Sequence, residues 1–225
     1  MANIEEPRDL ITVALHFGAV IDLYVEALLF LSVIPAFVAL GFVDERISRF
    51  GLSFYILFSS LAIFAMGEPI SAILYLVGFG VVVTIMIAYL EGKWKTVSHG
   101  YVDTRFKTKL ALIIIVLTAA FLVSRQLAYA VSLSVVSIGL LSIDRRKPPQ
   151  SIVGLVAVES AIFVILAELG LFTASIALLL SLLAIAGNLI FACLFLSAEN
   201  VLLRNSRDVN KERVIGGSSY DTEPD

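Results

Sequence analysis

The sequence predicts an all-α, polytopic transmembrane helical bundle of about seven spans, with the N-terminus outside and the C-terminus in the cytoplasm. Of the 225 residues, 59% are hydrophobic and only 16% are charged, and the mean hydropathy is +0.97. The charged residues are bunched between long apolar runs, and nearly all the basic ones fall on alternate connections. This composition is typical of a multi-pass membrane protein and not of a soluble domain.

Seven apolar runs follow one another, and each is expected to form one helix across the bilayer. The first run is too long for one upright helix and contains Pro35, so we expect it to be tilted or kinked. The seven helices are expected at residues 12–42, 51–66, 70–90, 110–124, 127–143, 151–172 and 173–197.

The helices group into two membrane parts and a tail. Residues 1–110 hold the first three helices and the long loop 91–109, and residues 110–197 hold the other four. Residues 198–225 form a polar tail, expected to be cytoplasmic and disordered at its tip.

The fourth and fifth helices are short for the ~20 residues that a membrane span needs. Two alternatives therefore stay open for residues 110–143. They form a re-entrant or interrupted pair, or they form one long helix that carries Arg125 inside it.

The basic residues set the orientation. With seven spans, one side of the membrane receives only Arg8 and Arg125, and the other side receives the remaining 14 of the 16 Lys and Arg. Lys and Arg accumulate on the cytoplasmic side of membrane proteins, so the N-terminus is expected outside and the C-terminus inside. The 14 residues are Arg46, Arg49, Lys93, Lys95, Arg105, Lys107, Lys109, Arg145, Arg146, Lys147, Arg204, Arg207, Lys211 and Arg213.

Glu159 is the strongest candidate for a functional residue. It lies near the middle of the apolar run 151–172, roughly 13 Å along a helix from its start. A charged side chain at that depth costs of order 2.5 kcal/mol or more, so it usually faces a protein interior or a water path. We expect Glu159 to exchange a proton. The alternative is a carboxyl that stays protonated, or that hydrogen-bonds to a neighbouring helix only for packing.

Three further polar residues are weaker candidates. Asp22 and Glu26 are four residues apart on the first helix and share one face, where two like charges repel. They are expected either to form the outer end of a proton path or to sit at the membrane interface without a role. Asn188 is a single amide deep in the last run, where an interhelical hydrogen bond is its usual role, and Gly187 beside it is expected to allow close helix packing.

Several kinds of chemistry have no signal in this chain. There is one cysteine and no Cys/His cluster, so no metal centre is expected. Phosphate-binding loops, hydrolase motifs and nucleic-acid patches are also missing, and no cofactor is expected. The basic loops are explained by topology and by anionic lipid.

Residues 127–197 resemble the K subunit of respiratory complex I, a family of three helices. The resemblance lies in the basic turn GLLSIDRRKPPQ (139–150), followed by the helix start SIVGLVAVES (151–160). It implies that Glu159 corresponds to the family's first membrane glutamate. The family's Gly-Leu-Glu is Ala-Val-Glu here, and its second glutamate has no counterpart, with Asn188 near that place.

The whole layout resembles the E-type membrane subunits of hydrogenase-4 and formate hydrogenlyase, which join extra N-terminal helices to a K-like unit. The run AMGEPISAILYLVGFGVVVTIMIAYLEGK (65–93) is similar to the third helix of those proteins, without the lysine associated with it. The resemblance implies a multi-pass subunit in the cell membrane that contributes to proton or sodium translocation. Its partners would be the membrane and hydrophilic subunits of a hydrogenase or complex-I-like assembly, and those partners would carry the redox chemistry. Two alternatives remain, a stand-alone ion transporter or antiporter subunit and a purely structural membrane anchor.

Overall fold

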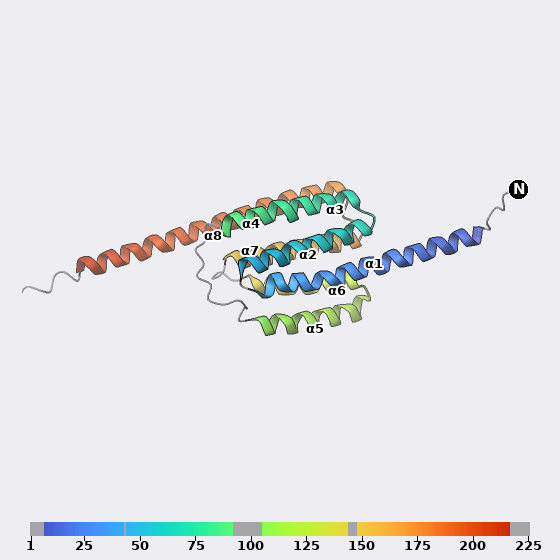
Figure 1. The fold of residues 1–225 in the computed structure, drawn as a ribbon. Helices are drawn as coiled ribbons and strands as arrows, with labels where there is room; N and C mark the ends of the chain where they lie inside the picture. The colour runs from blue at the N-terminus through green and yellow to red at the C-terminus, as the bar shows by residue number, and fades with distance from the viewer. Residues whose placement is uncertain (1–6, 43, 92–104, 144–147, 217–225) are drawn as a thin grey trace, which may run out of the picture. The chain divides into compact units, whose positions relative to one another are not determined.

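The computed structural model describes residues 7–42, 44–91, 105–143 and 148–216, and the chain is helical almost throughout these ranges (Figure 1). Within the described residues, five helices are long and apolar enough to cross a membrane. Two shorter apolar helices accompany them, Pro69–Val83 and Leu127–Ser142. The predicted all-helical fold class is therefore confirmed for the described residues, and five of the helices have the length and apolar composition of membrane spans. The five long spans are Gly18–Gly41, Arg46–Ala65, Phe106–Ser124, Gln150–Glu168 and Ala174–Leu194.

The first three helical runs end within one residue of their predicted positions, but the first two begin five and six residues earlier than predicted. Helix α1 (Pro7–Gly41) carries Pro35 inside it, and α2 (Glu45–Ala65) is capped by the Asp44 side chain, which accepts from two backbone N–H groups at 3.0 Å. The third run consists of α3 (Pro69–Tyr75), η1 (Leu76–Val83) and α4 (Thr84–Glu91) without interruption. Its middle segment is a π-helix, a rare form that the sequence did not indicate.

Helices α5 (Phe106–Ser124) and α6 (Leu127–Ser142) are two separate helices that pack against each other. Arg125 ends α5 in the left-handed conformation, with φ of 57°, and its N–H donates to the Phe121 carbonyl at 2.9 Å. A residue in that conformation cannot continue a right-handed helix. One long helix carrying Arg125 inside it is therefore excluded.

The last two helices are α7 (Pro148–Glu168) and α8 (Ala174–Gly216). Helix α8 extends beyond the predicted span, because residues 198–216 are helical. This part is polar but rich in good helix formers such as Ala, Leu, Glu, Lys and Arg, so a polar composition here does not mean coil. The expected disordered tip, most of loop 91–109 and the basic residues 145–147 lie outside the described residues.

The chain divides into two compact units, residues 1–188 and residues 189–225, and the second unit begins within α8. In the first unit, α1, α2, α7 and α6 contact one another around a ring. Helix α5 lies outside α6, and the run from α3 to α4 lies along α2 and α7 (Figure 1). Of the apolar window of α7, 72% is buried, against 11% for α5. Helix α7 is thus a core helix, and Glu159 lies on it.

Successive helical runs of the first unit place their connections at opposite ends. At one end, the cavity end, Ala65, Gln126 and Gly170 line a common cavity. At the other end, the basic end, the ring centroids of Phe37 and Phe106 are 4.9 Å apart, and Arg105 donates to the Leu141 carbonyl at 3.4 Å. Counting α3, η1 and α4 as one run, the described residues form seven helical runs in alternating directions.

Two close helix crossings depend on glycine. A Cβ on Gly51 of α2 would lie 2.5 Å from the Ala39 backbone nitrogen of α1. A Cβ on Gly154 of α7 would lie 2.7 Å from the Gly139 carbonyl oxygen of α6. The close approach expected at Gly187 is wrong, since a Cβ there would meet no atom within 4 Å.

The C-terminal end of α1 is capped by side chains from distant parts of the chain. Lys109 of α5 is fully buried and donates from Nζ to the Leu40 carbonyl, and Gln150 of α7 donates to the Phe42 carbonyl at 3.3 Å. Carbonyl groups at a helix C-terminus lack intrahelical donors and carry partial negative charge, so a cation is favourable there. Lys109 thus stabilises the fold, whereas the sequence had assigned it with the other basic residues to topology and lipid.

We expect Lys109→Met to lower the free energy of unfolding by about 2 kcal/mol, because a buried carbonyl loses its charged donor. Lys107→Met is the control, since Lys107 is exposed two residues earlier on the same helix and should change stability little. Thermal unfolding of the detergent-purified variants measures both effects. Equal midpoints for the two variants would contradict the capping role.

Candidate functional site: a membrane carboxyl and an acidic cavity

Glu159 lies at the midpoint of the apolar span Gln150–Glu168 and is half-buried. Its neighbours along α7 are small or apolar, and Val156 and Ala157 are fully buried. The helix therefore packs tightly on both sides of the carboxyl, and Glu159 lies midway along the apolar helix, as its place in the sequence indicates.

Asn188 of α8 provides the polar partner of this carboxyl. Its Nδ2 donates to Glu159 Oε2 at 2.7 Å and to the Ala184 carbonyl at 2.8 Å. The second bond fixes which amide atom faces Glu159, because only the NH₂ group can donate to a carbonyl. Asn188 is fully buried, and its Oδ1 has no hydrogen-bond partner among the described residues.

Glu159 and Asn188 have different chemical roles in this pair. The Glu159 carboxyl can bind and release a proton, whereas an amide cannot carry one at ordinary pH. The Asn188 NH₂ group donates to the carboxylate oxygen and so stabilises the charged form after a proton leaves. The bond also holds the carboxyl in one position between α7 and α8. The geometry suits a site that exchanges one proton.

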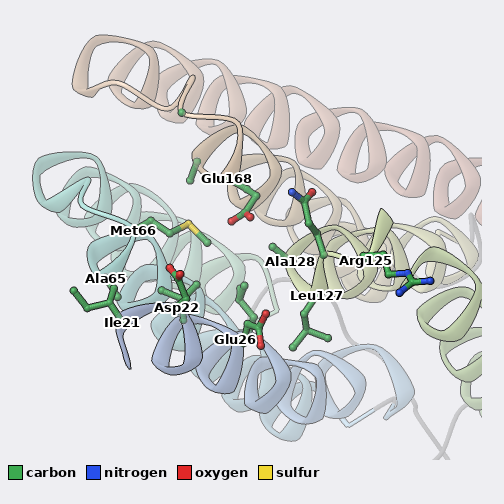
Figure 2. Close-up of a pocket in the computed structure, with 14 residues that line it drawn as sticks. Ile21, Asp22, Glu26, Ala65, Met66, Arg125, Leu127, Ala128 and Glu168 are labelled. Atoms are coloured by element: carbon green, nitrogen blue, oxygen red, sulfur yellow. The ribbon is translucent and has the colours of Figure 1, made fainter. Parts of the chain in front are cut away.

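A second polar site lies at the cavity end. A cavity of about 530 Å³ opens between α1, the end of α2, the α5–α6 turn and the end of α7. Asp22 and Glu26 of α1 line it together, as their spacing predicts, and Glu168 of α7 joins them. Figure 2 shows Asp22 and Glu168 facing one another across the opening. The charges of Asp22 and Glu26 act directly on Glu168, so the three carboxyls form one electrostatic cluster.

Arg125 also lines this cavity, from the turn between α5 and α6. Its side chain extends away from the three carboxyls (Figure 2). No ion pair joins it to Asp22, Glu26 or Glu168 in the part of the chain that the structure describes. Arg125 therefore offsets the negative charge of the cavity at a distance rather than by direct contact.

The structure separates the four predicted site residues into two places. Glu159 and Asn188 form one pair, and Asp22 and Glu26 lie at the cavity end with Glu168. Glu168 was not among the residues that the sequence predicted for a site. The signal was available, because Glu168 lies nine residues after Glu159, half a turn away on α7, and so faces a different helix.

No protein-family model, curated protein or solved structure matches this chain. Among the described residues, no group of three or more His, Cys, Asp or Glu side chains is arranged to hold a metal ion.

Proposed function

We propose that this chain is an integral membrane subunit that carries a proton at Glu159, within a membrane-bound hydrogenase or complex-I-like assembly. Other subunits perform the redox chemistry, and the chain contributes to proton or sodium translocation coupled to it. All seven helical runs cross the cell membrane, with the N-terminus outside and the C-terminus in the cytoplasm.

One observation carries the proton-carrying role. A carboxyl in the middle of a membrane-length core helix is hydrogen-bonded, at 2.7 Å, to a fully buried amide of another helix. Ionisable groups at such depth are costly, and they mark proton and ion paths in membrane proteins. The same hydrogen bond would also form if Glu159 served only to pack α7 against α8. The test is therefore a variant that keeps this bond but cannot release a proton, and the proposal expects that variant to lose transport.

The alternating helical runs support the proposed topology. The connections at the cavity end carry Arg125 as their only basic residue, whereas Arg105 and the first turns of α2 and α5, with Arg46 and Lys107, lie at the basic end. This is the asymmetry expected if the basic end faces the cytoplasm. With the N-terminus outside, Asp22, Glu26 and Glu168 lie toward the outer face.

Two further points support a subunit over a free-standing chain. The Glu159 side chain is only half-buried in this chain, and contact between lipid and its exposed part would be unfavourable for a carboxylate. A neighbouring subunit would cover that exposed part. The sequence resemblance to hydrogenase and complex I membrane subunits supplies the kind of assembly, whose redox centres would lie in the partner subunits.

A stand-alone ion transporter is the second candidate function. The π-helix η1 interrupts the regular hydrogen bonding of the third helical run, and irregular membrane helices frequently line transporter substrate sites. This candidate requires no redox partner.

Purification from the native membrane in mild detergent, followed by mass spectrometry, separates the two candidates. We expect hydrogenase-like or complex-I-like subunits in stoichiometric amounts with this chain. Recovery of the chain alone or as a homo-oligomer, under conditions that keep other membrane complexes intact, would favour the transporter and overturn the subunit assignment.

A further inference from the structure

Four hydroxyl groups meet in the core between α2, α3 and α7. They belong to Tyr55 and Ser59 of α2, Tyr75 of α3 and Ser160 of α7, and all four residues are at most 1% exposed. The hydroxyls of Tyr55 and Tyr75 both lie close to those of Ser59 and Ser160. Residues from three helices thus bring their only polar side-chain atoms to one place in an apolar core.

The hydrogen bonds among these groups are incomplete. Tyr75 and Ser160 are hydrogen-bonded to each other. The Tyr55 hydroxyl and the Ser59 hydroxyl have no hydrogen-bond partner within the described ranges. Each hydroxyl can donate one hydrogen bond and accept two, so most of the capacity of the cluster is unused.

Ser59 differs from Ser134 and Ser142 of α6, and like Ser132 and Ser181 it is a buried helical serine whose hydroxyl has no hydrogen-bond partner among the described residues. Ser134 and Ser142 satisfy their hydroxyls by donating to the carbonyl four residues earlier, at 2.7 and 2.8 Å. The Ser59 hydroxyl makes no such bond and lies near the tyrosine hydroxyls. Buried hydroxyls nearly always have a partner, and a small molecule with several donors and acceptors satisfies such a group best.

We propose that Tyr55, Ser59, Tyr75 and Ser160 form a buried binding site for ordered water beside Glu159. Ser160 follows Glu159 on α7, so the site begins on the helix face about 100° from the carboxyl. Toward the cavity end, Ser59 lies six residues before Ala65, which lines the acidic cavity, a rise of about 9 Å along α2. The water site therefore lies between Glu159 and the outer carboxyls.

If Glu159 carries a proton as proposed above, this site extends its path, and this second step rests on that function. A water oxygen takes the proton that leaves Glu159, while the same water passes a different proton to the next hydroxyl or water. One proton moves in total, and each hydroxyl ends as it began. An apolar core without this site offers no such chain.

Radiolytic labelling of the native assembly in ¹⁸O water tests the hydration directly, because side chains next to bound water are oxidised with oxygen from that water. We expect Tyr55 and Tyr75 to be labelled at least several-fold faster than Phe79, which stacks against Tyr75 and is equally buried. Labelling of the two tyrosines at the rate of Phe79 would overturn the proposal.

Thermal unfolding of Tyr55→Phe gives a second measurement. If a bound water accepts from or donates to the Tyr55 hydroxyl, the Tyr55→Phe substitution lowers the unfolding midpoint. If the core is dry, the substitution removes an unsatisfied hydroxyl, so the midpoint rises, and that result overturns the proposed water site.

Measurements of proton translocation distinguish failure of this inference from failure of the proposed function. If Glu159→Gln loses proton translocation while the Tyr55→Phe/Ser59→Ala variant translocates protons at the full rate, the proposed function stands and the water relay is overturned.

Discussion

If the proposed function holds, Glu159→Gln is expected to abolish most proton translocation while the proposed assembly remains folded and complete. Glutamine has the size of glutamate and keeps a carbonyl oxygen that can accept from Asn188 Nδ2, so the contact between α7 and α8 survives. It cannot release a proton, and we expect the rate of translocation to fall about a hundredfold. The measurement is proton uptake by liposomes that contain the co-purified assembly, driven by the electron donor that its redox subunits oxidise.

Glu68→Gln is the matched control for this prediction. It makes the same chemical change in the turn before α3, where Glu68 accepts from the Ser71 hydroxyl at 3.2 Å and a glutamine oxygen can replace it. We expect normal translocation and normal assembly in this variant. Normal translocation in Glu159→Gln would leave Glu159 with a packing role and favour the structural-anchor alternative.

Gly51→Ala prevents α1 and α2 from packing as they do in the wild-type protein. The added Cβ would meet the backbone nitrogen and Cα of Ala39 at 2.5 and 2.9 Å and the Pro35 carbonyl at 2.8 Å. Backbone atoms cannot turn aside as a side chain can, so the helices must separate. Separation also strains the bond from Ser48 to the Ala39 carbonyl, less than a turn away on α2. We expect a loss of about 3 kcal/mol in the free energy of unfolding.

Gly187→Ala is the control for the crossing. It is also a glycine inside a membrane helix, but a Cβ there meets no atom within 4 Å. Alanine is favoured over glycine in a helix by about 1 kcal/mol, so this variant should be as stable as wild type or slightly more stable. Thermal unfolding in detergent compares the two. Similar midpoints for Gly51→Ala and Gly187→Ala would show that the crossing does not set the stability of the bundle.

The sequence predicted the elements well because membrane helices are defined by local apolar length. Helices α2, α6 and α7 begin or end within a few residues of charges, turns or prolines that the sequence displays. The π-helix η1 was missed because the apolar run LVGFGVVV carries no feature that distinguishes it from an α-helix. The continuation of α8 to Gly216 was missed because the last helix was ended where the apolar run stops, and polar residues such as Glu, Lys and Arg can extend a helix beyond it.

The candidate site was predictable where it depended on one helix and not where it depended on several. The depth of Glu159 and the shared face of Asp22 and Glu26 follow from helix periodicity. Glu168 lies beside Asp22 and Glu26 of α1 because of the way the helices pack around α7. The sequence of one helix does not determine this tertiary arrangement. The hydroxyl cluster was missed for the same reason, since Tyr55, Tyr75 and Ser160 are each unremarkable in their own segments.

Infrared difference spectroscopy on the native assembly tests most directly whether Glu159 exchanges a proton. A protonated carboxyl has a C=O stretching band that a carboxylate lacks, so its gain or loss can be followed as the redox subunits are reduced and reoxidised. We expect one such band to change with each redox step in the wild-type protein and to be missing from Glu159→Gln. An identical carboxyl signal in both proteins, or no carboxyl signal in either, would contradict the assignment of Glu159 as the proton carrier.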